Sequence, residues 1–288
     1  MKKKLEDLNL LDDFLFGSLV SYPGLGVKFI RLLLQIIFGR TFGKLVVHPQ
    51  KVYYGSDTDK HGTRLDVYLE EEQESDFTAE EDEEPGGATI YDVEPDQNDN
   101  EAARTALPKR IRFYHAKIDA QSLKSGETYH ALKNVVIIII TPYDPFGIDR
   151  MVYTIQNRCR EEPDMLYDDG AMTVYLYTKG HRGNPPEELQ KLLRYMEHTT
   201  EENATTKELQ DIQQMVEVVK RDGEVSIEYM KIYEREEMLL NRGRQEGRRE
   251  GELRERTNTE AQRLRADAAE QENARLRAEL ARLKAGQV

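Results

Sequence analysis

The fold of this chain is decided by two short segments, Gly62-Thr-Arg-Leu-Asp-Val-Tyr-Leu69 and Ala88-Thr-Ile-Tyr-Asp-Val-Glu-Pro-Asp-Gln97. Each is predicted to be a β-strand, because apolar and polar residues alternate in the first and β-formers fill the second. Strands this close in sequence most simply pair as a hairpin, which brings Asp66 and Glu94 near one another. Two neighbouring carboxylates suit a hard cation such as Mg2+. Solvated surface is the alternative interpretation of these acidic residues.

The segment between the two strands is strongly acidic. From Glu70 to Glu84 the chain has ten Asp or Glu and no Lys or Arg, so only −3 of its net charge of −13 belongs to the remainder. We interpret residues 70–88 as a disordered insertion in a hairpin loop, since the segment is poor in apolar residues. Its alternative role is an acidic mimic of nucleic acid. Because the acid is local, net charge does not exclude DNA as a partner.

Apolar patterns around the hairpin predict an α/β domain. Residues 8–40 are predicted to form two helices, and residues 44–54 a strand. Val135 to Thr141, with four successive isoleucines, is predicted to be a strand buried on both faces in the middle of a sheet. Residues 151–156 and 172–178 are predicted to be two further strands. The intervening Asp144 has the composition of a turn around it, which we favour over a catalytic role.

The predicted helix from Ala102 to Leu123 carries the densest group of cations near the candidate site. Four residues at helical spacing should face the sheet: Leu107, Ile111, Tyr114 and Ile118. The remaining faces carry a basic set: Lys109, Arg110, Arg112, His115 and Lys117. Contacts with DNA phosphates require such a surface, whereas a solvated helix face is the ordinary interpretation.

The last third of the chain is predicted to be helical, with a helical region at 184–240 and a charged helical tail at 241–288. In this tail six residues fit the a and d positions of about three heptads: Ala266, Ala269, Asn273, Leu276, Leu280 and Leu283. Asn273 falls at an a position, where a polar residue favours two strands. We therefore expect a short coiled coil that joins two copies as a homodimer, with a lone solvated helix as the alternative.

Cysteine usage and hydropathy predict a cytoplasmic protein. The chain has one cysteine, Cys159, as in proteins of a reducing compartment. Its basic N-terminus lacks the apolar core of a signal peptide, and its longest apolar run, Val135 to Ile140, is too short to span a bilayer. We expect no membrane partner.

The order of these motifs resembles that of the PD-(D/E)XK nuclease family transposases, the Rpn-like recombination-promoting nucleases. The likeness covers residues 8–250 and rests on these motifs: Leu65-Asp-Val-Tyr68, Tyr91-Asp-Val-Glu-Pro95, Leu107-Pro-Lys-Arg-Ile-Arg-Phe-Tyr-His115, the isoleucine strand, Asp12-Asp-Phe-Leu-Phe16, Gly126-Glu-Thr-Tyr129 and Tyr229-Met230. The resemblance implies a restriction-endonuclease-like core over residues 1–183, a mixed sheet flanked by helices in the order α-β-β-β-α-β. It also implies a DNA endonuclease that depends on Mg2+ or Mn2+ and acts in transposition or recombination.

The resemblance places the two metal-binding carboxylates at Asp66 and Glu94. The family motif then expects Lys or Gln two residues after the glutamate, where this chain has Asp96, followed by Gln97. Asp96 cannot donate the proton or the positive charge that a lysine offers, although it can act as an additional carboxylate.

Three alternatives follow from this departure. A bulge at Pro95 brings Gln97 into the position of the missing residue, or Lys109 or Arg110 supplies the charge from the following helix, or catalysis is lost. In the first two cases Lys109, Arg110, Arg112 and Lys117 contact DNA. In the third, the chain is a catalytically inactive nuclease-fold protein that acts as a DNA-binding or protein-interaction module.

Overall fold

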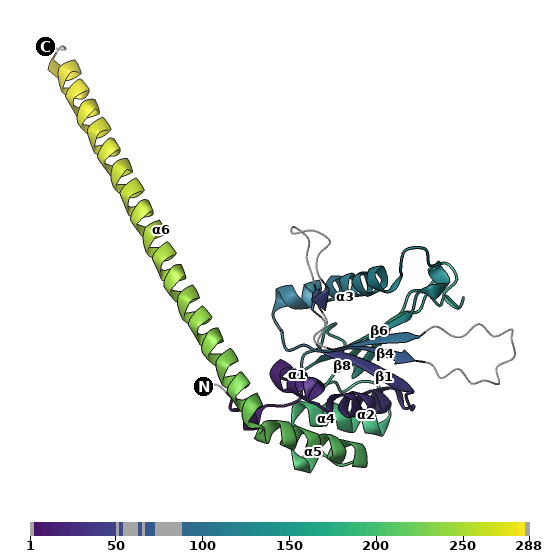
Figure 1. Ribbon diagram of the computed structural model, residues 1–288. Coiled ribbons are helices and arrows are strands. Elements are labelled where there is room, and N and C mark those ends of the chain that lie inside the picture. Colours follow the sequence, from purple (N-terminus) through teal and green to yellow (C-terminus); the bar gives the residue numbers. More distant parts are fainter. Residues whose placement is uncertain (1–2, 50–51, 54–62, 65–66, 73–87, 286–288) are drawn as a thin grey trace. The chain divides into compact units, whose positions relative to one another are not determined.

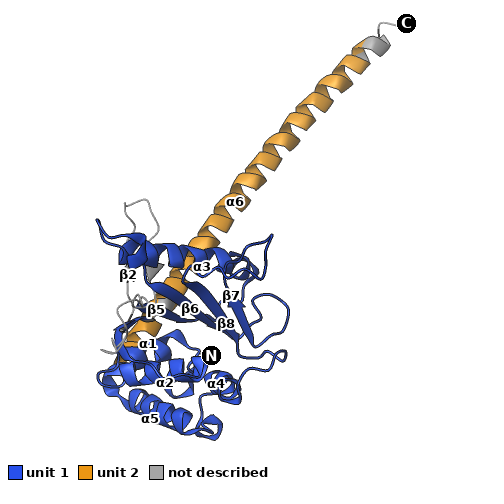
Figure 2. Ribbon diagram, turned by 90° about the vertical axis from the view of Figure 1, so that its right-hand side faces the viewer, with its two compact units in different colours: residues 1–226 blue, residues 227–288 orange. Residues whose placement is uncertain are grey.

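A computed structural model of the chain describes residues 3–49, 52–53, 63–64, 67–72 and 88–285. The chain divides into two compact units, Met1–Ser226 and Ile227–Val288, which are coloured separately in Figure 2. The first unit holds the sheet and all the helices that pack on it. The described residues of the second unit all belong to one long helix.

Unit 1 is built on a six-stranded mixed sheet with the strand order β1-β4-β5-β6-β8-β7 (Figure 1). Its strands are Lys44–Pro49 (β1), Val67–Glu72 (β4), Thr89–Pro95 (β5), Asn134–Thr141 (β6), Val152–Ile155 (β7) and Ala171–Tyr177 (β8). Strands β1, β4 and β5 are antiparallel, β5, β6 and β8 are parallel, and β7 pairs antiparallel with β8 at the edge. A separate two-stranded sheet joins Val52–Tyr53 (β2) and Thr63–Arg64 (β3).

The predicted hairpin is confirmed as the β4–β5 pair. Tyr68 lies opposite Asp92, and Glu71 lies opposite Thr89. The predicted acidic insertion begins later than expected, because residues 70–72 continue β4. Cationic partners explain the difference: Glu70 pairs with Lys133 at 2.6 Å, and Glu71 pairs with Arg40 at 2.7 Å. Residues 73–87 of the predicted insertion lie outside the described residues, as does Asp66.

Helices cover both faces of the sheet (Figure 1). One face carries Asp13–Ser21 (α1), Gly26–Phe38 (α2), Glu187–Glu197 (α4) and Lys207–Arg221 (α5). The other face carries Glu101–Ser122 (α3), which connects the parallel strands β5 and β6, a connection that parallel pairing requires. Short 3-10 helices occur at Leu5–Asp7, Tyr129–Ala131 and Glu201–Asn203.

Local sequence explains where these helices begin and end. Asp12, Asn100 and Thr206 cap α1, α3 and α5, each accepting a hydrogen bond from a backbone N–H of the first turn. Gly39 ends α2 in the left-handed conformation at φ 64°, which glycine adopts without steric cost.

The core of the sheet centres on β6, as predicted from its isoleucines. Residues 137–140 are fully buried, and Ile137 and Ile139 pack in the cluster that lies beneath α3. Helix α3 contributes Leu107, Ile111 and Ile118 to this cluster, and Tyr114 packs against it. The prediction that this apolar stripe faces the sheet is therefore confirmed.

The helix α6 extends over residues Gly223–Ala285 and makes up the described part of unit 2. It runs without a break across residue 240, where the sequence predicted a change of segment. Every side chain from residue 241 to residue 280 is exposed. Helices α4 and α5, by contrast, belong to unit 1, where both contact α2.

No single helix in the described part of the chain is both long and apolar enough to cross a membrane. Helices α1 and α2 reach a sufficient length and apolar content only when taken together, and a bend of 117° separates them.

Candidate functional site

Three acidic residues follow one another at alternate positions along and just beyond β5. Asp92, Glu94 and Asp96 expose only 0%, 6% and 7% of their surfaces. Side chains alternate between the faces of a strand, so Asp92 and Glu94 share a face with Ile90, which packs beneath α3. Buried carboxylates are costly unless they are paired, so their position beneath α3 marks a candidate functional site.

Asp96 is held in place by three contacts. Its backbone N–H donates to the carbonyl of Ile140 at 2.8 Å, which extends the β5–β6 ladder by one residue. One carboxylate oxygen accepts from the backbone N–H of Asn98 at 2.8 Å, and the other forms an ion pair with Arg110 of α3. Both oxygens of this side chain are thus engaged by the protein.

Arg110 is the cation of the site. Burial acts to lower the pKa of its guanidinium, but the carboxylates of Asp96 and, more weakly, Glu94 raise that pKa above its ordinary value. The side chain remains charged and retains 33% exposure, whereas that of Asp96 has only 7%. Because the Asp96 carboxylate is almost fully buried, loss of the Arg110 guanidinium would remove the cation that offsets the cost of that burial.

Two tyrosines complete the surroundings of Arg110. Burial raises the pKa of Tyr143, and the neighbouring Asp96 carboxylate raises it further. Burial also raises the pKa of Tyr175 to about 12, an effect that Arg110 opposes. Both hydroxyls therefore stay protonated at neutral pH, and they lie near the charged guanidinium of Arg110.

The donor chemistry of the site is that of hard oxygen ligands. Within the described residues, however, no group of three or more His, Cys, Asp or Glu side chains is close enough to hold a metal ion. Mg2+ commonly uses only one or two protein carboxylates, together with waters and phosphate oxygens. Glu94 fits that requirement as one such ligand, and the second predicted ligand, Asp66, lies outside the described residues.

The structure does not bring Gln97 into this acidic site. Its side-chain amide donates a hydrogen bond of 2.6 Å to the carbonyl of Leu11. Pairing between β5 and β6 continues one residue to one residue through Pro95, so the bulge expected there is absent from this ladder. Proline is tolerated because it ends the strand, where the ladder has no need of its missing N–H.

The predicted basic surface of α3 separates into two parts. Lys109 and Arg112 are exposed, and the Lys117 ammonium lies 5.6 Å from the centre of the Phe113 ring. Arg110 and His115 are turned toward the sheet. His115 contacts the Thr173 hydroxyl of β8 at 2.9 Å, and burial lowers its pKa.

Asp144 has the turn role that its sequence context predicted. Its carboxylate accepts hydrogen bonds from the backbone N–H groups of Phe146 at 3.0 Å and Asp149 at 2.5 Å, and from the Tyr153 hydroxyl at 2.9 Å. These contacts close the loop between β6 and β7.

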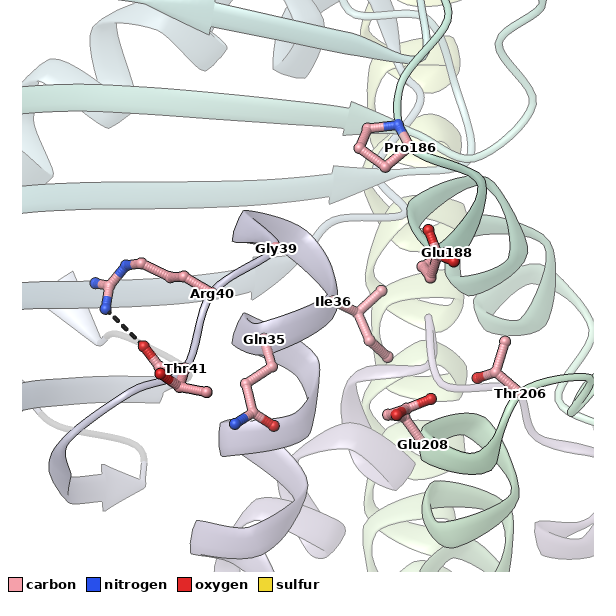
Figure 3. Close-up of a pocket in the computed structure, with 9 residues that line it drawn as sticks. All are labelled: Gln35, Ile36, Gly39, Arg40, Thr41, Pro186, Glu188, Thr206 and Glu208. Atoms are coloured by element: carbon pink, nitrogen blue, oxygen red, sulfur yellow. Dashed lines mark hydrogen bonds between the residues drawn. The ribbon is translucent and has the colours of Figure 1, made fainter.

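A hollow of about 620 Å³ opens on the opposite face of the sheet, between the end of α2 and the beginnings of α4 and α5 (Figure 3). It is lined by Gln35, Ile36, Gly39, Arg40, Thr41, Pro186, Glu188, Thr206 and Glu208. Arg40 points away from Glu188 and Glu208 (Figure 3) and is bonded to Glu71. The hollow therefore offers carboxylates without a cation directed at them, which does not suit a phosphate.

Comparisons with protein-family models, with curated proteins and with solved structures found no match for this chain. The interpretation of the site therefore depends on its own geometry and chemistry.

Sequence reasoning identified Glu94, Asp96 and Arg110 but missed three residues around them. Asp92 was given no role, although its spacing of two from Glu94 and four from Asp96 was a signal for a shared strand face. Tyr143 and Tyr175 had no signal in the sequence, because only the parallel pairing of β5, β6 and β8 brings them near Arg110.

Proposed function

We propose that this protein is a metal-dependent DNA endonuclease with a restriction-endonuclease-like PD-(D/E)XK core, acting in transposition or recombination. The sheet supports this proposal, because three antiparallel strands are followed by a helix and a parallel strand, in the order that the resemblance implies. The observation that carries it is the pair of buried carboxylates, Glu94 and Asp96, with Arg110 of α3 in an ion pair with Asp96.

In this proposal Asp66 and Glu94 hold Mg2+ or Mn2+. The metal, when bound, supplies a Lewis acid for the phosphodiester and lowers the pKa of an attacking water. Glu94 contributes the rigidity that a ligand needs, since it lies on a strand paired with β6 at Ile139. Carboxylate oxygens suit both of these cations.

Arg110 takes the place of the lysine that the family motif expects two residues after the glutamate. Its planar guanidinium can donate to Asp96 and still direct further N–H groups at a phosphate oxygen. Asp96 positions this guanidinium rather than binding substrate. Of the alternatives open at the sequence level, this geometry favours Arg110 over Gln97, which is bonded to Leu11, and over the exposed Lys109.

The exposed cations of α3 extend the same surface toward DNA. Lys109 and Arg112 present their charges to solvent, and Lys117 lies two turns further along. Contacts of this kind position the sugar–phosphate backbone without reading its sequence. Replacement of Arg112 with glutamate should therefore weaken binding to every DNA sequence alike and reduce its dependence on salt.

The test is nicking of supercoiled plasmid in Mg2+ or Mn2+. We expect wild-type cleavage, and a loss of roughly 100-fold or more in Asp66→Ala and in Glu94→Gln, since a lost ligand costs more than a lost supporting residue. Arg110→Lys should keep part of the activity, because lysine keeps the positive charge but lacks the planar, forked set of N–H donors of a guanidinium. The matched control is Glu101→Gln, an exposed carboxylate at the start of α3.

Cleavage by folded Glu94→Gln at the wild-type rate would exclude the assigned metal ligand. Cleavage that persists after removal of divalent cations with a chelator would exclude the metal-dependent mechanism.

A second candidate function is a catalytically inactive nuclease-fold protein that binds DNA or another protein. The engagement of both Asp96 oxygens by Asn98 and Arg110 favours it, because the carboxylate competes with a phosphate for the same guanidinium. This candidate predicts DNA binding that is weakened by Arg112→Glu, with no cleavage by wild type in either metal. Cleavage that depends on Glu94 would exclude it.

A further inference from the structure

Helix α6 is far longer than an ordinary helix of a globular protein. Its 63 residues extend about 95 Å at 1.5 Å per residue. Every residue between 241 and 280 is exposed, and Leu276 and Leu280 expose 48% and 56% of their surfaces. Tertiary packing of an apolar face supplies most helix stability in proteins, so this segment is suited to a partner outside the chain.

The residues beside its apolar seam follow a charge pattern. With Asn273 at a heptad a position, the g positions are Arg265, Glu272 and Glu279, and the e positions that follow each by five residues are Glu270, Arg277 and Lys284. In a parallel two-stranded coiled coil, g of one helix lies beside the next e of its partner. All three pairs then join opposite charges, and each occurs twice by symmetry.

We propose that residues 265–284 form a parallel, in-register coiled coil with a second copy of this chain. Complementarity between the chain and itself is what selects this partner. All three pairs are attractive together when the two helices run in the same direction with the same residues side by side.

Asn273 gives an independent reason for the same register. In parallel pairing, an a-position asparagine lies beside its own copy and can hydrogen-bond to it. In antiparallel pairing it would lie beside a d position, where this seam offers Ala269 or Leu276. A buried amide without a partner is costly, so the antiparallel arrangement is disfavoured.

The first experiment is sedimentation of the full chain over a range of concentrations. We expect a dimer, and we expect Arg277→Glu to raise its dissociation constant roughly tenfold or more, because two attractive pairs become repulsive. The double variant Glu272→Arg with Arg277→Glu should restore wild-type dimerisation, since it exchanges the two charges of each pair. The matched control is Arg275→Glu, which makes the same charge change at a c position away from the seam.

The second experiment tests direction and register by disulfide formation in a Cys159→Ser background. Asn273→Cys should cross-link under mild oxidation, because parallel pairing sets the two sulfurs side by side. Arg275→Cys, at the c position, should remain a monomer on a non-reducing gel.

A monomer at all concentrations up to about 100 µM would overturn the proposal, since that bounds the affinity well below that of a specific dimer. So would a dimer that is equally weakened by Arg275→Glu and Arg277→Glu, or one in which Asn273→Cys fails to cross-link. These readouts do not involve cleavage, so the proposal stands or falls separately from the nuclease.

Discussion

Glu71 of β4 shows how one buried side chain ties distant segments together. Its carboxylate accepts hydrogen bonds of 2.9 and 2.7 Å from the guanidinium of Arg40, and one of 3.2 Å from the backbone N–H of Gly43. The Tyr91 hydroxyl of β5 also donates to it, at 3.2 Å. The residues that follow α2 are thereby bound to both strands of the β4–β5 hairpin.

The hydrogen bonds from Arg40 hold the pKa of Glu71 below its ordinary value of 4.5, against the opposing effect of burial. A carboxyl with a lower pKa in the folded state stabilises that state in its charged form. The contribution of Glu71 to the free energy of unfolding is therefore present above its ordinary pKa of 4.5. It is lost as the pH falls through the lower pKa of the folded state.

We expect Glu71→Gln to lower the free energy of unfolding by about 1–2 kcal/mol at pH 7, the range for a charge-assisted pair with one partly solvated member. The difference from wild type should shrink as the pH falls from 4.5 through the lower pKa of the folded state, because the wild-type carboxyl then becomes neutral. Urea denaturation at neutral and acidic pH measures both. The exposed Glu187→Gln, which loses its pair with Lys191, is the control and should show a smaller loss. A pH-independent difference for Glu71→Gln would refute the linkage.

At the scale of elements, the junction of α1 and α2 depends on a close backbone approach. A Cβ at Gly26, the first residue of α2, would lie 1.8 Å from the carbonyl oxygen of Val20 in α1. The neighbouring atom is backbone, which cannot rotate away as a side chain can. Only glycine therefore allows α2 to begin where it does.

Gly26→Ala should destabilise unit 1 by at least about 2 kcal/mol, because the two helices must move apart and their buried contacts loosen. The control is Gly223→Ala at the start of α6, where a Cβ would have no heavy atom within 4 Å. That change should be neutral or slightly stabilising, since alanine favours helix. Thermal unfolding of both variants gives the comparison, and equal melting temperatures would contradict the steric argument.

Elements whose signal is local could be predicted from the sequence. The isoleucines of β6, the apolar stripe of α3 and the β4–β5 hairpin each depend on residues close together in the chain, and each is confirmed. The strand order could not be predicted in the same way. The placement of β8 beside β6, with β7 outside it, depends on pairings between segments far apart in sequence.

The candidate site follows the same division. Glu94 and Arg110 were marked by their spacing within a strand and a helix, but their closeness to Tyr143 and Tyr175 depends on the assembled sheet. Gln97 is an example in which sequence position alone was misleading. Its sequence position suggested a role in catalysis, whereas a long-range bond to Leu11 determines where its side chain lies.

At the scale of the whole molecule, the stability of the chain is concentrated in unit 1. Among the described residues, every buried apolar side chain lies between Leu5 and Val219. Hydrophobic burial is the main favourable contribution to folding, and α6 beyond residue 226 has no buried apolar residue in the described part of the chain. Unit 1 and the tail should therefore be separable in function as well as in stability.

A chain that ends at Ser226 tests this separation. We expect its free energy of unfolding to lie within about 1 kcal/mol of the full chain at low protein concentration, because its core is complete. Its sedimentation coefficient should no longer depend on concentration, since the coiled-coil seam is gone. Chemical denaturation and sedimentation of the two chains side by side measure both quantities. A truncated chain that unfolds far more readily would show that the tail stabilises unit 1, and a truncated chain that still dimerises would place the contact between copies in unit 1.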